Sequence, residues 1–138
     1  MKRGMQITSA DNPLVRRLRR FAESPRACRM AGRSIAEGLH LVESAVAAGV
    51  VIDTIVLSDR ANEVARDLAH RLSAQGMCRH VDLAAPLYDA ISPVEHGVGI
   101  LAEIVIESSN LPVATAADAV YLDGVQDPGN VGTLLRTA

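Results

Sequence analysis

The 138-residue chain is long enough for one domain of ordinary size and too short for two complete α/β domains. With 49% hydrophobic and 22% charged residues, the chain does not have the composition of a disordered protein. Only 2% of the residues are aromatic, which excludes a nucleic-acid-binding surface on which bases stack against aromatic side chains. The formal net charge of −2 hides an asymmetry, because residues 1–33 carry nine basic and two acidic side chains while the remainder is strongly acidic.

The first elements predicted are two short basic helices, which together make a basic helical arm over residues 1–33. Asn12 and Pro13 suit the N-cap and first position of a helix, and apolar residues recur at helical spacing from Leu14 to Phe21. A second helix is expected from Pro25 to Gly32. An arginine-rich face suits phosphate groups, although a solvated polar face would show the same pattern. The candidate RNA-binding residues are Arg16, Arg17, Arg19, Arg20, Arg26, Arg29 and Arg33.

From residue 34 onward, strands and helices alternate. Strands are predicted over residues 34–37, 52–57, 77–81 and 99–106, and helices over 39–48, 60–74 and 83–91. We expect Asp59 to cap the helix over 60–74, with Val64, Leu68 and Leu72 on its buried side. A polar turn is expected over 92–97. This alternation predicts an α/β protein whose layered sheet is at least partly parallel.

The sequence from residue 108 onward predicts a linker followed by the start of another unit. Ser, Asn and Pro interrupt every periodicity over residues 108–118. A strand is expected over 120–125, then a Pro-Gly turn, then a helix capped by Asn130. A free helix N-terminus after a glycine-rich turn suits an anion, but neither a Walker phosphate loop nor a Gly-x-Gly-x-x-Gly fingerprint is present. Arg136, one turn after Gly132, can reach the side that this glycine leaves open.

The segment from Gln126 to Ala138 resembles the first motif of the SpoU/TrmH-type RNA methyltransferases in the SPOUT superfamily. In that motif a strand precedes Asp/Glu-x-Pro-x-Asn-x-Gly, and the following helix carries an arginine. The Ile-Thr-Ser-x-x-Asn-Pro run at 7–13, the Glu-Gly-x-x-Leu-Val run at 37–42 and the Gly-Ile-Leu-Ala run at 99–102 are also similar to this family.

The resemblance implies two parts. Residues 34–107 would form a three-layer α/β/α RNA-binding domain, similar to kink-turn-binding ribosomal proteins. After the linker, residues 119–138 would supply the first strand and helix of an incomplete, knotted SPOUT methyltransferase domain. By motif match, Asn130 and Arg136 would be catalytic and act on a ribose 2′-hydroxyl.

The same resemblance implies partners and a methyl donor. The donor would be S-adenosylmethionine, held by later motifs that the 138 residues lack, so the chain offers no cofactor-binding residue and is expected to be inactive alone. RNA would be the partner, ribosomal RNA more than transfer RNA, and the complete protein would be a homodimer.

One alternative of a different class stays open, namely a non-catalytic RNA-binding adaptor module. A metal site is not expected, because the four histidines (His40, His70, His80 and His96) and the cysteines Cys28 and Cys78 lack ligand spacing. No signal core or membrane-spanning stretch is visible, so we expect a cytoplasmic protein without a membrane partner.

Overall fold

The computed structural model describes residues 4–92, 94, 99–106 and 120–137. The chain divides into two compact units, residues 1–108 and 109–138. The expected linker falls on residues 107–119, outside the described residues, as does most of the polar turn expected over 92–97. Where one domain ends and the next begins therefore stays a prediction.

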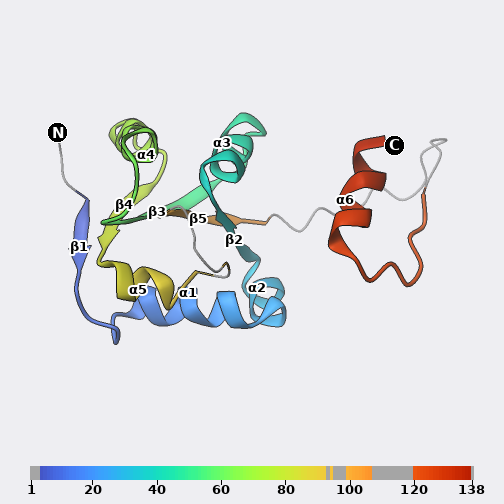
Figure 1. Ribbon diagram of the computed structural model, residues 1–138, viewed down its shortest axis with the longest axis horizontal. Coiled ribbons are helices and arrows are strands. Elements are labelled where there is room, and N and C mark those ends of the chain that lie inside the picture. Colours follow the sequence, from blue (N-terminus) through green and yellow to red (C-terminus); the bar gives the residue numbers. More distant parts are fainter. Residues whose placement is uncertain (1–3, 93, 95–98, 107–119, 138) are drawn as a thin grey trace. The chain divides into compact units, whose positions relative to one another are not determined.

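The first unit is built on one mixed five-stranded sheet (Figure 1). Its strands are β1 (Met5–Ile7), β2 (Arg33–Glu37), β3 (Ile52–Ser58), β4 (Arg79–Leu83) and β5 (Ile100–Val105), in the order β1-β4-β3-β5-β2. β4 pairs in parallel with both β1 and β3, whereas β5 pairs antiparallel with both β3 and β2. The sheet is thus partly parallel, as the sequence predicts.

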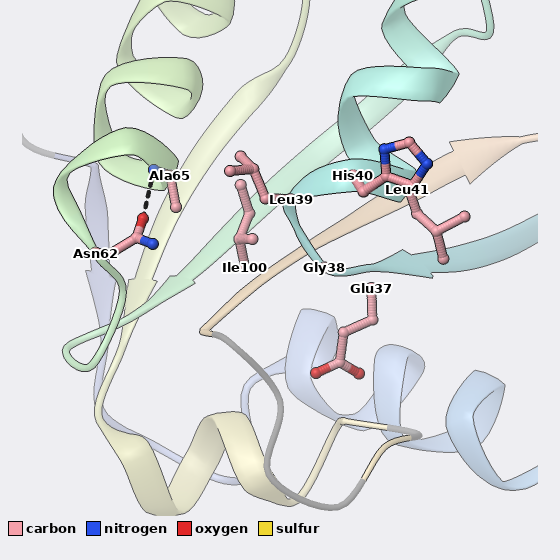
Figure 2. Close-up of a pocket in the computed structure, with 8 residues that line it drawn as sticks. All are labelled: Glu37, Gly38, Leu39, His40, Leu41, Asn62, Ala65 and Ile100. Carbon is pink, nitrogen blue, oxygen red and sulfur yellow. Dashed lines mark hydrogen bonds between the residues drawn. The ribbon is translucent and has the colours of Figure 1, made fainter.

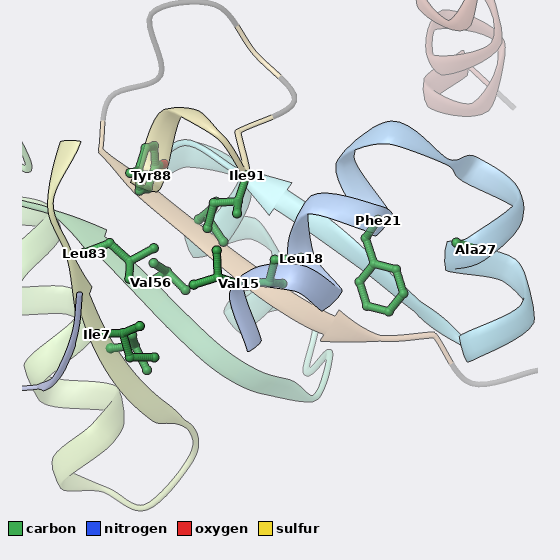
Figure 3. Close-up of a cluster of buried hydrophobic side chains, with 11 residues drawn as sticks. Ile7, Val15, Leu18, Phe21, Ala27, Val56, Leu83, Tyr88 and Ile91 are labelled. Atoms are coloured by element: carbon green, nitrogen blue, oxygen red, sulfur yellow. The ribbon is translucent and has the colours of Figure 1, made fainter. Parts of the chain in front are cut away.

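Helices cover both faces of this sheet, which confirms the predicted three layers. α1 (Pro13–Glu23), α2 (Pro25–Ala31) and α5 (Ala85–Asp89) lie on one face, and α3 (Leu39–Ala47) and α4 (Glu63–Ala74) on the other (Figure 1). Because side chains alternate along a strand, β3 contributes Val56 to the first layer and Ile55 and Leu57 to the second. The two helices of the expected basic arm pack against the sheet and form part of the hydrophobic core on that face. Their buried residues Val15, Leu18, Phe21 and Ala27 lie in one cluster with Val56 and Leu83 (Figure 3).

Several predicted helix boundaries are confirmed in detail. Asn12 caps α1 by accepting the backbone N–H of Leu14 at 2.9 Å, and Pro13 occupies the first helical position. Ser24 caps α2 in the same way, and Gly32 ends it in the left-handed conformation.

The prediction for α4 was wrong at its N-terminus. The helix begins at Glu63 and is capped by Asn62, not Asp59, because Ser58–Ala61 forms a turn that Arg66 holds through the carbonyl oxygens of Asp59 and Ala61. Its buried stripe is Ala65, Leu68, Ala69 and Leu72, so Val64 faces outward and is 57% exposed.

One strand was not predicted, and one predicted strand is absent. The sequence pattern does not predict β1, because three residues at a sheet edge carry too weak a signal. Residues 120–127 form no strand, since the described part of the second unit offers no neighbouring strand for their backbone. The only regular element described there is α6 (Pro128–Thr137). Among the described residues, no helix is both long and apolar enough to cross a membrane.

Candidate nucleic-acid interface

Helix α1 presents arginines to solvent because its opposite side is committed to the core. Val15 and Leu18 are fully buried and Phe21 nearly so, which turns Arg16 and Arg20 outward. Of the seven arginines predicted to bind RNA, the exposed ones are Arg16, Arg20, Arg26 and Arg29, and Arg19 is partly buried. These side chains carry positive charge on the two helices that the sequence marks as basic.

The other two predicted arginines, Arg17 and Arg33, are engaged inside the domain. Arg17 donates from Nη2 to Oε2 of Glu103 at 2.7 Å, and Arg33 donates from Nη1 to Oε1 at 3.3 Å. Glu103 lies on β5 and is fully buried. A buried carboxylate is costly without cationic partners, so the two arginines compensate its charge and tie α1 and β2 to β5.

Asp53 extends this network through an irregularity in β3. Ile52 pairs with Ile104 and Thr54 with Glu103, which leaves Asp53 as the extra residue of a bulge. Its carboxylate lies 2.6 Å from Arg79 Nη2, 3.3 Å from Arg33 Nη1 and 3.8 Å from Arg17 Nη2. Burial alone would raise the pKa of Asp53, but hydrogen bonds from Arg79, Thr54 and Arg33 outweigh it and lower the pKa from 3.8 to about 2.

Sequence reasoning did not find Glu103, Asp53 or Arg79. One signal was present, since Glu103 interrupts an otherwise apolar strand, and an acid in such a place needs a basic partner. The structure thus separates the seven predicted arginines into two that are ion-paired internally and five that make no ion pair within the described part of the chain. To bind the two internally paired arginines, RNA would have to compete with Glu103 and Asp53.

A cleft of about 430 Å³ lies between the N-termini of α3 and α4. Figure 2 shows Leu39, Ala65 and Ile100 facing one another across it, with Asn62 at the start of α4 and Glu37 directed to the other side of its strand. The Oδ1 atom of Asn62 is already used to cap α4. The lining is mostly apolar, so we assign this cleft no chemistry.

Glu37 belongs instead to a buried polar cluster on the opposite face of the sheet. Its carboxylate accepts hydrogen bonds from Ser92 Oγ at 2.8 Å and from the Tyr88 hydroxyl at 3.2 Å. Burial raises the pKa of Glu37, although the hydrogen bonds from Ser92 and Tyr88 oppose that rise, and burial likewise raises the pKa of Tyr88. The cluster ties β2 to α5.

In the second unit, the motif at the start of α6 corrects one expectation. Asp127, not Asn130, caps the helix, since its Oδ1 accepts the N–H of Gly129 at 2.8 Å and Pro128 takes the first helical position. Asn130 lies in the first turn, and its side chain is exposed. Within the described residues, its side-chain amide makes no hydrogen bond.

Arg136 lies over Gly132, as the spacing predicts. A Cβ atom at Gly132 would lie 3.6 Å from Arg136 Nη1, which is van der Waals contact, so the guanidinium covers the bare glycine. Arg136 also donates to Thr133 Oγ1 at 3.4 Å. Positions six residues apart on a helix differ by about 120° around its axis, and no hydrogen bond joins Asn130 to Arg136 among the residues described. The structure therefore does not bring the two predicted catalytic side chains together.

The histidines form no ligand cluster in the described ranges. His80 Nε2 lies 3.1 Å from Asp82 Oδ1, and the His70 ring meets the His80 ring edge-on at 4.9 Å between centroids. Burial lowers the pKa of His80 despite the opposing charge of Asp82. Across the part of the chain that the structure describes, no three His, Cys, Asp or Glu side chains are placed to hold a metal ion.

Comparison with known proteins decides the family of the first unit. Residues 12–102, which span α1 to β5, match the MRM3-like substrate binding domain. The chain belongs to this family. Within the MRM3-like substrate-binding domain the matched segment includes both basic helices, so their arginines are part of the family's domain rather than an appendage to it.

Sequence similarity to one curated protein extends beyond the residues that match the MRM3-like substrate-binding domain. An uncharacterized tRNA/rRNA methyltransferase of Synechocystis sp. is 32% identical over 136 residues, which are 96% of this chain and 48% of that protein. The 23S rRNA (guanosine(2553)-2′-O)-methyltransferase RlmP of Bacillus subtilis is 31% identical over 102 residues, 74% of this chain and 38% of its own length. The chain thus spans half or less of the length of these curated relatives.

Solved structures show the same fold. An RNA 2′-O ribose methyltransferase matches with a TM-score of 0.70 and 23% identity, over 96% of this chain and 51% of that one. An AdoMet-bound rRNA methyltransferase from Sinorhizobium meliloti matches with a TM-score of 0.61 and 21% identity, over 75% of this chain and 37% of its own. These similarities show that this chain shares its fold with parts of structures solved for RNA methyltransferases.

Proposed function

We propose that this chain is the RNA-binding part and first catalytic motif of a SpoU-type RNA methyltransferase, which transfers a methyl group from S-adenosylmethionine to a ribose 2′-hydroxyl. One observation carries the proposal: a member of the MRM3-like substrate-binding-domain family is joined in a single chain to a helix on which Arg136 covers Gly132. The name of the Bacillus subtilis relative supports ribosomal RNA as the substrate, and that of the Synechocystis relative is compatible with either ribosomal or transfer RNA. The complete protein is proposed to act as a homodimer, on the family resemblance.

In this proposal Arg136 stabilises negative charge and does not act as a base. A guanidinium carries a permanent positive charge and five N–H donors, and it has no acceptor with which to take up a proton. Arg136 would bind the phosphate beside the target ribose and stabilise charge that develops on the 2′-oxygen. Asn130, which is exposed and turned away from Arg136 around the helix, would orient the ribose by hydrogen bonding.

The methyl donor is not assigned to residues of this chain. No side chain of α6 is buried, so the described residues of the second unit do not form the enclosed site that such a cofactor needs. The AdoMet-bound relative from Sinorhizobium meliloti supports the identity of the donor. The donor would supply the methyl group, while Asn130 and Arg136 would act only on the ribose and its phosphate.

The test is a methyl-transfer assay with the full-length gene product on ribosomal and transfer RNA. Arg136→Ala should remove methyl transfer and leave RNA binding nearly intact, because Arg136 would contact only the reacting nucleotide. Arg71→Ala, an exposed arginine on α4, is the matched control and should keep full activity. Undiminished transfer by Arg136→Ala would refute its catalytic role, and an inactive full-length protein that still binds RNA would favour the adaptor alternative.

A further inference from the structure

An open hollow lies on the surface between the two basic helices. It measures about 470 Å³ and lies between α1 and α2. Its lining consists of three arginines from α1, one aromatic ring and three side chains of α2, namely Arg16, Arg17, Arg20, Phe21, Ala27, Met30 and Ala31. None of these residues is acidic, so the lining combines positive charge with apolar side chains.

The three arginines of the hollow differ in what they can still bind. Arg17 is committed to the buried carboxylate of Glu103 at 2.7 Å. Arg16 and Arg20 are exposed and make no ion pair with any side chain in the described ranges. They lie four residues apart on one side of α1, which separates them by about 6 Å along the axis. Two guanidiniums at this spacing can bind one phosphate group or two adjacent ones.

The apolar part of the hollow suits the remainder of a nucleotide. Met30 lies on α2 and is 80% exposed, although methionine is an apolar residue. A flexible, polarizable thioether of this kind adapts its shape to the group it contacts and interacts favourably with flat rings. Phe21 also lines the hollow, but it is almost fully buried and so offers little surface for stacking. The hollow thus combines phosphate-binding groups on one wall with an adaptable apolar wall opposite.

We propose that this hollow between α1 and α2 binds the RNA backbone, with Arg16 and Arg20 as its phosphate-binding residues. The assignment rests on the proposed function for the choice of RNA as the polyanion. The charge pattern of the sequence does not distinguish among the seven predicted RNA-binding arginines, whereas this proposal selects two of them. Contacts of this type position RNA without reading its bases, so the site is indifferent to sequence.

The experiment measures binding of a fluorescein-labelled oligouridine to the 138-residue chain by anisotropy, between about 50 and 200 mM salt. The double variant Arg16→Ala/Arg20→Ala should weaken binding roughly twentyfold near 0.1 M salt and reduce the slope of log K against log salt by about 1.4, as expected for two lost phosphate contacts on a single strand. Because both side chains are exposed, the variant should remain folded, which its melting curve checks.

The control is Arg60→Ala/Arg71→Ala, which removes the same formal charge. Both arginines are exposed outside the hollow, and the Arg60 ion pair to Asp89 lies on the surface, where such pairs contribute little to stability. This variant should bind oligouridine with the salt slope of the unmodified chain. A control that loses as much affinity as the Arg16/Arg20 variant would overturn the proposal, since bulk charge would then explain both losses.

Other outcomes separate this site from the function it depends on. If the unmodified chain binds oligouridine and the Arg16/Arg20 variant binds it equally well, the hollow is excluded while RNA binding by the domain stands. If the unmodified chain binds no RNA, the site and the RNA-binding part of the proposed function both fail. If the double variant loses binding to poly-glutamate but not to oligouridine, the hollow is a protein-binding site and the proposal is wrong. Methyl transfer is tested independently, through Arg136.

Discussion

At the scale of single residues, the feature that most shapes the domain is a pair of carboxylates surrounded by three guanidiniums. Glu103 is buried on β5, and the bulge at Asp53 places a second carboxylate beside it. Arg17, Arg33 and Arg79 come from α1, β2 and β4, so the ion pairs connect elements that the hydrophobic clusters alone would hold less specifically. Such networks cost desolvation energy. Removing one charged partner therefore destabilises the fold more than replacing the whole pair by apolar residues would.

Asp53→Asn should make the free energy of unfolding depend less on pH in the acid range. The pKa of Asp53 is about 2 in the folded chain against 3.8 when unperturbed, so its charge stabilises the fold above about pH 4, and this contribution disappears as the pH falls from about 4 to about 2. Since the side chain is 27% exposed and therefore partly screened, we expect the effect to be about 1–2 kcal/mol. Urea unfolding at several pH values between 7 and 2 measures it.

The control for this experiment is Asp67→Asn. Asp67 is exposed on α4 and forms no ion pair within the described part of the chain, so its replacement should leave the pH dependence of unfolding unchanged. If Asp53→Asn lost stability between pH 4 and pH 2 as steeply as the unmodified chain, the ion pairs of Asp53 would not contribute in solution.

Which arginines anchor the fold could not be predicted from the sequence. Arg17 and Glu103 are 86 positions apart, and Arg33 and Glu103 are 70 apart, so no local pattern connects them. The cluster of charge at the N-terminus predicts a phosphate-binding surface, and it treats Arg16 and Arg17 alike. The difference between them arises from the rotation of α1 about its own axis as it packs on the sheet. In this orientation Arg16 faces solvent and Arg17 faces the buried carboxylate of Glu103.

At the scale of elements, the start of β5 is fitted closely against the turn before α4. Gly99 has φ of +82°, and a Cβ atom there would lie 2.9 Å from the backbone nitrogen and 3.0 Å from the Cα of Ala61. Its carbonyl oxygen also accepts the N–H of Ser58 at 2.8 Å. Because the opposing atoms belong to the backbone of the turn that follows β3, neither this turn nor the start of β5 can move without disturbing the ladder between β3 and β5.

Gly99→Ala should therefore destabilise the chain by about 3 kcal/mol, from backbone strain and overpacking together. Gly76→Ala is the matched variant, since Gly76 has φ of +71° but nothing within 4 Å of an added Cβ, and it should cost only about 1 kcal/mol. Denaturant unfolding followed by circular dichroism measures both. Equal losses in the two variants would show that the close approach to Ala61 has no energetic consequence.

Elements with strong local signals could be predicted, and those that depend on distant partners could not. Asn12-Pro13 and the glycine after α2 mark their helix ends by side-chain and backbone chemistry that acts within a few residues. The start of α4 was misplaced because Asp59 and Asn62 are equally good caps, and the choice depends on Arg66 holding the turn. An apolar run at 120–125 favoured a strand, but a strand forms only where another backbone pairs with it.

At the scale of the whole chain, the two units differ in how they are stabilised. Both hydrophobic clusters of the first unit draw on residues between Ile7 and Ala102. Helix α6 has no buried residue and is held by local contacts such as the Asp127 cap. An isolated helix of 10 residues is marginal in water, so the motif that carries Asn130 and Arg136 does not provide its own stability.

Removal of residues 109–138 should accordingly leave the first unit as stable as it is in the whole chain. We expect the melting temperature to change by less than about 4 °C, which corresponds to less than about 1 kcal/mol, and oligouridine binding to be undiminished. Val56→Ala, a truncation in the core, is the positive control and should lower the melting temperature clearly, because it leaves a cavity between α1 and the sheet. A larger shift on removing 109–138, or a loss of binding, would mean that the second unit contributes to the fold or to the RNA surface of the first.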